Sequence, residues 1–291
     1  MVQDQLTDFI ERYRAKQIAR LMAMESFRQA WKVWEPQIRT LTSGYTDAAA
    51  IYALGNHLSD IFRSTGTGGR DQASLSGGGA AWEALVCWYL NWVFVGTRAI
   101  AFKQNKALIP DCIFDAATVT YGNQQTNTES DISVIVLPDN LIFPSHVKGD
   151  KAIFDNLVLQ DFSKVGLGII QCKTNWNDNA QIPMLWDMVY KADYSKASGV
   201  KIGRNGYTVQ HLDFSYSFVV VPSQKKEIVA GSIPTVRVNA LTGGNYWGQA
   251  TKNGVALSLT EIFMRNFGSV FPKNVQDTIK SAIADKIGPY A

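Results

Sequence analysis

One segment of the chain, residues 80–95, is apolar on almost every side. It reads AAWEALVCWYLNWVFV, and Glu83 is its only charged side chain. An apolar run of this kind predicts a helix that other elements surround on all sides. Glu83 and Asn91 interrupt the run, which also falls short of a membrane span. With 46% hydrophobic residues in a chain of 291, we expect the helix to lie inside a sizeable core.

Helical patterns precede this segment, and short β-like runs follow it. The predicted helices cover residues 6–22, 25–41, 46–62, 80–95, 182–194, 259–267 and 275–286. The predicted strands cover residues 98–102, 107–114, 119–121, 131–137, 166–173, 214–221 and 235–240. This order predicts an α/β or α+β fold with a mixed sheet. We expect a helical region over 1–64 packed on the core, a Gly/Ser-rich irregular loop over 65–79, and the core with its closing helices over 80–291.

Charge and cysteine content favour no specialised class. The formal charge of +3 permits a nucleic-acid partner without indicating one. Cys87, Cys112 and Cys172 lie in apolar segments without metal-binding or redox spacing, so we interpret them as small core residues. The first residues lack the basic start and apolar run of a signal peptide, and we expect a cytoplasmic protein.

Polar side chains end one of the predicted strands. Gln171 and Lys173 are separated by one residue, so in a strand both point to the face that carries Leu167 and Ile169. A second predicted strand begins with an acid, Asp131. If these two strands are neighbours, the carboxylate can meet the amide and the lysine at one edge of the sheet.

The two elements Ser130-Asp131-Ile132 and Gln171-Cys172-Lys173 resemble the PD-(D/E)xK nuclease superfamily, in a Gln-x-Lys variant. The resemblance covers about residues 78–195, and Glu83 matches the glutamate that many members carry on a preceding helix. It implies a restriction-endonuclease-like core, a mixed β-sheet flanked by helices. Two features depart from the pattern: an amide replaces an acid, and residues 138–165 must form an inserted loop or an extra hairpin.

The resemblance also implies a Mg²⁺ site. Asp131 and Glu83 would hold the ion, with help from the Gln171 amide and the Cys172 backbone carbonyl. Glu83 would supply the charge that the glutamine lacks, because a lone carboxylate on an apolar helix needs a cation nearby, either Mg²⁺ or Lys173. Lys173 would orient the attacking water and offset charge on the phosphate.

Amide and basic side chains and one aromatic side chain are candidates for contact with double-stranded DNA. They are Asn175, Trp176, Asn177, Asn179, Gln181, Arg70, Lys201, Arg204, Lys225 and Lys226. A capped turn before a helix and ordinary solvated loops would give the same patterns. Tyr246 and Trp247 stand among glycines in a predicted loop, where they could contact DNA or a second subunit.

Each site residue also has a structural interpretation. Asp131 could open a strand after a turn, and the glutamine and lysine could lie at a strand end in solvent. Glu83 could form a structural ion pair with an arginine such as Arg98. Asp111, in a literal Pro-Asp, is the reserve candidate for the opening acid.

Size and resemblance favour a type II restriction endonuclease that acts as a homodimer on a short, two-fold symmetric site. A structure-specific or repair nuclease and a catalytically degenerate DNA-binding protein of the same fold remain the alternatives. The recognition sequence is not encoded in any local pattern.

Overall fold

The computed structural model describes most of the chain. The described residues are 2–66, 76–103, 105, 107–127, 131–174, 186, 189–192, 199–221, 233, 236, 246–247, 259–271 and 274–287.

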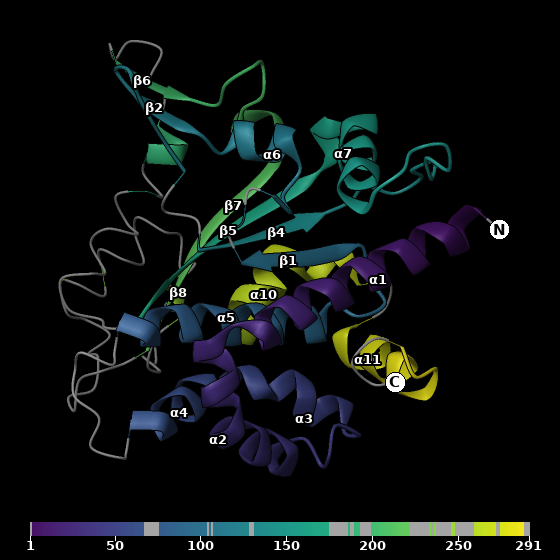
Figure 1. Cartoon of the computed structure of the whole chain (residues 1–291), viewed down its shortest axis with the longest axis vertical. Helices are drawn as coiled ribbons and strands as arrows, with labels where there is room; N and C mark the ends of the chain where they lie inside the picture. The colour runs from purple at the N-terminus through teal and green to yellow at the C-terminus, as the bar shows by residue number, and fades with distance from the viewer. Residues whose placement is uncertain are drawn as a thin grey trace.

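A five-stranded mixed sheet forms the centre of the molecule (Figure 1). Its order is β1 (Ala99–Lys103), β4 (Ile132–Val136), β5 (Gly166–Lys173), β7 (Asp213–Val220) and β8 (Tyr246–Trp247). The first three strands are antiparallel, whereas β5, β7 and β8 run parallel. The predicted mixed α/β architecture is therefore confirmed.

Helices cover both faces of this sheet because side chains alternate along each strand. The helices are α1 (Val2–Ala23), α2 (Glu25–Leu41), α3 (Ala48–Ala53), α4 (Leu58–Arg63), α5 (Ser76–Val93), α6 (Asp111–Ala116), α7 (Asp150–Gln160), α10 (Leu259–Phe267) and α11 (Val275–Ala284). In β4, Ile132 and Val134 join the apolar cluster that contains α5, whereas Ile135 joins the cluster formed with α1, α6 and α7. The apolar segment around Glu83 thus lies inside the core, as predicted.

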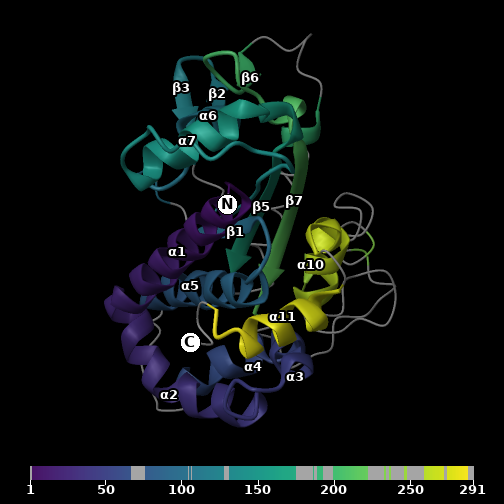
Figure 2. The same cartoon turned by 90° about the vertical axis from the view of Figure 1, so that its right-hand side faces the viewer.

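Two smaller parts lie at the two ends of the long axis (Figures 1 and 2). Helices α2, α3 and α4 occupy one end, and a three-stranded antiparallel sheet occupies the other. This second sheet has the order β3 (Gln124–Thr126), β2 (Val119–Tyr121) and β6 (Val200–Ile202). Short 3-10 turns complete the described elements: η1 (Leu54–Asn56), η2 (Ser64–Gly66), η4 (Phe162–Lys164), η6 (Val209–His211) and η7 (Gly268–Val270).

A buried arginine joins α1 to the turn between α5 and β1. Arg14 is fully buried, and its Nη2 donates to the carbonyl oxygens of Thr97 at 3.0 Å and Ala99 at 2.7 Å. Arg14 also pairs with Glu11, which accepts the Gly96 N–H at 2.8 Å. The guanidinium therefore satisfies backbone groups that would otherwise be buried without partners.

Four predictions about the elements are wrong. Residues 107–114 are not a strand, because Asp111–Ala116 forms helix α6, in which Cys112, Ile113 and Ala116 are buried at a helical spacing. Residues 138–165 do not form the predicted inserted loop or extra hairpin, because they contain helix α7. Helix α5 begins at Ser76, so the last glycines of the predicted loop are helical.

The fourth is the predicted helix over 46–62, which is broken into α3, η1 and α4. The strand predicted over 235–240 lies outside the described residues apart from residue 236, which is helical. No helix in the described part of the chain is both long and apolar enough to cross a membrane.

Packing of α10 on the sheet depends on a glycine in β5. A Cβ at Gly168 would lie 2.8 Å from Cε1 of Phe267, and closer still to Cζ of that buried ring. We expect Gly168→Ala to lower the free energy of unfolding by about 1–3 kcal/mol, because the ring must move away in a packed core. Urea denaturation measures the effect.

A second glycine provides the matched control. A Cβ at Gly79, in the first part of α5, meets nothing within 4 Å. Gly79→Ala should therefore stabilise slightly, by about 0.5–1 kcal/mol. Equal stability of Gly168→Ala and the wild type would contradict the proposed contact with α10.

Candidate functional site

The predicted meeting of two strand ends is present in the structure. β4 and β5 are antiparallel neighbours, and Ile132 pairs with Ile170, so Asp131 faces Gln171 one step further along. The carboxylate of Asp131 accepts the Cys172 backbone N–H through Oδ2 at 2.6 Å. The acid and the Gln-x-Lys element are therefore joined by a direct contact.

The side chains at the end of β5 divide between the two faces of the sheet. Leu167 and Ile169 belong to the cluster opposite α5, and Gln171 follows the same alternation. Gln171 is fully buried, and its Oε1 accepts a hydrogen bond from the Tyr216 hydroxyl at 2.9 Å. Cys172 lies on the other face, in the cluster that contains α5.

Glu83 approaches the strand end from the α5 face. Its partner is Lys103, the last residue of β1, with Nζ 2.5 Å from Oε2. The sequence interpretation expected Mg²⁺ or Lys173 to neutralise Glu83, with Arg98 as the structural alternative. Glu83 is in an ion pair, as that alternative expected, but its partner is a lysine and not Arg98, which pairs with Asp139 at 2.9 Å. Sequence reasoning missed Lys103, although it is the charge that directly follows a predicted strand.

Two carboxylates and one ammonium group affect the pKa of the Cys172 thiol. Burial raises the pKa of this thiol well above its usual value, and the negative charges of Asp131 and Glu83 raise it further. The positive charge of Lys103 acts in the opposite direction. Asp131 contacts the Cys172 N–H directly, and the Cys172 side chain packs on the face covered by α5, the helix that carries Glu83.

These two carboxylates fit the chemistry of a Mg²⁺ site. Among the described residues, no group of three or more His, Cys, Asp and Glu side chains is arranged to hold a metal ion. Mg²⁺, however, is usually bound in proteins through one or two carboxylates together with waters and substrate phosphates. Asp131 and Glu83 would supply that number of carboxylates. The predicted ligand Gln171 lies on the opposite face of the sheet from Glu83, and its amide oxygen is engaged with Tyr216.

Most of the predicted DNA contacts lie outside the described residues. These are Arg70, Asn175, Trp176, Asn177, Asn179, Gln181, Lys225 and Lys226. Lys201 is exposed on β6. Arg204 contacts Asp115 at 2.5 Å and the Gln125 amide oxygen at 3.0 Å, so its guanidinium joins the second sheet to α6.

Two other predicted features are placed by the structure. The backbone of Tyr246 and Trp247 is not a loop but the edge strand β8, paired with Phe218 and Val219. Asp111, the reserve candidate, lies in the first turn of α6 and pairs with Lys151 at 2.9 Å.

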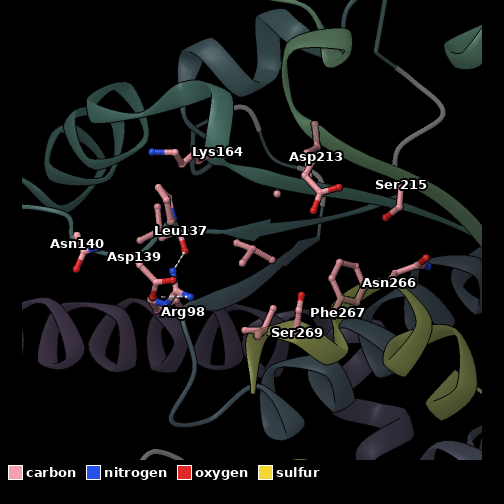
Figure 3. Close-up of a pocket in the computed structure, with 15 residues that line it drawn as sticks. Arg98, Leu137, Asp139, Asn140, Lys164, Asp213, Ser215, Asn266, Phe267 and Ser269 are labelled. Atoms are coloured by element: carbon pink, nitrogen blue, oxygen red, sulfur yellow. Dashed lines mark hydrogen bonds and ion pairs between the residues drawn. The ribbon is translucent and has the colours of Figure 1, made fainter. Parts of the chain in front are cut away.

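A cavity of about 290 Å³ lies at the opposite end of β4 and β5 from Asp131 (Figure 3). Val136, which ends β4, and Gly166, which begins β5, are among its lining residues. Arg98 donates to the Leu137 carbonyl in its wall. Arg98 in this wall pairs with Asp139, and the lining includes none of Glu83, Asp131, Gln171 and Lys173.

No protein-family model matches the chain, and no curated protein matches it.

Burial should make the cysteines unreactive in the folded protein. Cys87, Cys112 and Cys172 are all buried, and desolvation raises the pKa of Cys87 to about 12 and that of Cys112 to about 11. We expect no thiol to react with Ellman's reagent at pH 8 in buffer, and all three to react in urea. Rapid labelling of native protein would show that the strand end around Cys172 opens to solvent.

Proposed function

We propose that this protein is a Mg²⁺-dependent endonuclease of double-stranded DNA with a restriction-endonuclease-like core. The observation that carries the proposal is the contact of the Asp131 carboxylate with the Cys172 backbone, at the point where Gln171 and Lys173 end a core strand. Glu83 adds a second carboxylate from α5. The resemblance to the PD-(D/E)xK superfamily rests on the same residues.

The chain's own groups have distinct roles in this proposal. Asp131 and Glu83 would hold the ion, which when bound polarises the scissile phosphate and acidifies a water. The Cys172 N–H fixes the orientation of the Asp131 carboxylate. Lys173 would orient the attacking water and offset negative charge on the phosphate. The Tyr216 hydroxyl holds the Gln171 side chain in place from the neighbouring strand β7.

Within this chemistry we favour a type II restriction endonuclease that acts in the cytoplasm as a homodimer. This preference rests on the resemblance of the Asp131 and Gln-x-Lys elements to the PD-(D/E)xK superfamily. A two-fold symmetric DNA site would be cut on both strands by two copies related by the same symmetry.

Cleavage of plasmid and phage DNA by the purified protein tests the proposal. We expect cutting with Mg²⁺ and none with EDTA. Discrete fragments would support a restriction endonuclease, whereas a smear would favour a structure-specific or repair nuclease. Binding of DNA without any cutting, on all substrates and with Mg²⁺ or Mn²⁺, would contradict the nuclease and favour a degenerate DNA-binding protein.

A further inference from the structure

Lys103 occupies a position among the site charges that the proposed chemistry does not use. It ends β1 at the point where that strand pairs with Ile132, the residue that follows Asp131. Its side chain points to the α5 face, because Ala99 and Ala101 alternate with it and lie in the cluster of α5. Lys103 thus lies beside Glu83 and close to the proposed metal ligand Asp131.

The pair between Lys103 and Glu83 is partly shielded from water. The two side chains are 23% and 20% exposed, and Nζ lies 2.5 Å from Oε2. In such surroundings a carboxylate and an ammonium attract each other more strongly than at the open surface, and removal of either leaves the other poorly compensated. Glu83 therefore has a cation in place before any metal binds.

A divalent ion and the ammonium would compete for the same carboxylate. Mg–O bonds are about 2.1 Å long, so an ion bound to Oε2 would lie within a few ångströms of Nζ. Two cations at that separation repel each other strongly in a partly dry site. Binding of a metal through Glu83 must therefore weaken or displace the contact with Lys103.

We infer that Lys103 is an internal counterion that competes with divalent metal for Glu83 and lowers the metal affinity of the site. The inference rests on the proposed Mg²⁺ site. Without metal, the carboxylates of Asp131 and Glu83 are balanced in formal charge by the ammonium groups of Lys103 and Lys173. Once a divalent ion enters, the site carries an excess of positive charge, which favours the anionic DNA backbone as the next ligand. Metal and DNA would then bind with positive coupling.

Mn²⁺ binding, measured by isothermal titration and by electron paramagnetic resonance without DNA, tests this inference. We expect Lys103→Met to bind Mn²⁺ at least about tenfold more tightly than wild type, because the competing charge is gone. Lys103→Arg, which keeps the charge, should bind like wild type. Adding Glu83→Gln to Lys103→Met should remove the gain. Lys164→Met, which removes an exposed lysine paired with Asp161, should not change the affinity.

A measurement on the wild type covers the case in which Lys103→Met does not fold without metal. Displacement of Lys103 by Mn²⁺ should increase its modification by an amine-reactive reagent, read by mass spectrometry. Lys164 should be modified equally with and without Mn²⁺.

The outcomes separate this inference from the proposed function. Wild type that binds Mn²⁺, with no gain in Lys103→Met and no increase in Lys103 labelling, would overturn the counterion role and leave the nuclease proposal standing. Binding by Lys103→Met alone would support the inference. Absence of Mn²⁺ binding in wild type and variants, with DNA cleavage also absent, would overturn both.

Discussion

Replacement of Asp131 by asparagine is expected to reduce Mg²⁺-dependent DNA cleavage by at least about 10³-fold. The amide oxygen of asparagine can still accept the Cys172 N–H that Asp131 accepts at 2.6 Å, so the strand end should keep its structure. The negative charge that would hold the ion is lost. Initial rates of supercoiled-plasmid nicking, with circular dichroism to check the fold, measure the effect.

Controls for this experiment follow from the geometry. Asp139→Asn changes an exposed acid paired with Arg98, at the other end of β4, and should cut at the wild-type rate. Lys173→Ala should be as inactive as the Asp131 variant, because it removes the positive charge expected at the phosphate. Full activity in both Asp131→Asn and Lys173→Ala would show that the catalytic centre lies elsewhere.

Replacement of Arg14 by methionine is expected to lower the free energy of unfolding by about 3–5 kcal/mol. The variant leaves the carbonyl oxygens of Thr97 and Ala99 without their donor in a fully buried place. It also leaves Glu11 without its cation. Because methionine fills much of the same volume, the loss reports mainly on the missing hydrogen bonds and charge. Urea and thermal denaturation measure it.

Arg12→Met is the matched control on the same helix. The Arg12 side chain is 52% exposed and contacts Asp150 at 3.4 Å, so its loss should cost less than about 1 kcal/mol. Equal losses of unfolding free energy in the two arginine variants would mean that the buried network around Arg14 does not stabilise the packing of α1 against the start of β1.

The sequence predicted elements well where periodicity was strong. The bounds of α2, β5 and α10 agree with the prediction, since α2 and α10 have a clear helical period and β5 is a short apolar run. The sequence predicts a strand around Asp111 because a short apolar run fits either period, whereas in the structure Pro110 and Asp111 begin helix α6. Helix α7 was missed within the insertion, where Gly149, with φ of 90°, precedes its first turn.

In the candidate site, too, some contacts could be predicted from the sequence and others could not. The meeting of Asp131 with the Gln-x-Lys element could be predicted, because two neighbouring strands bring their ends together. The contact of Lys103 with Glu83 could not be predicted. It depends on how α5 crosses the end of β1, and no local sequence pattern determines that crossing. The hydrogen bond between Tyr216 and Gln171 likewise could not be predicted, because it depends on the parallel pairing of β5 with β7.

The pairing of β5 with β7 has a consequence for local unfolding of the protein. β5 is paired with β7 over all eight of its residues, and the Lys173 carbonyl accepts one further bond from Val221 at 2.9 Å. On the other side, the Asp131 carboxylate caps the Cys172 amide. Amide protons here should exchange with deuterium only through cooperative opening of the whole sheet. We therefore expect the strand that carries Gln171 and Lys173 to belong to the slowest-exchanging unit, with no fraying of its end ahead of global unfolding.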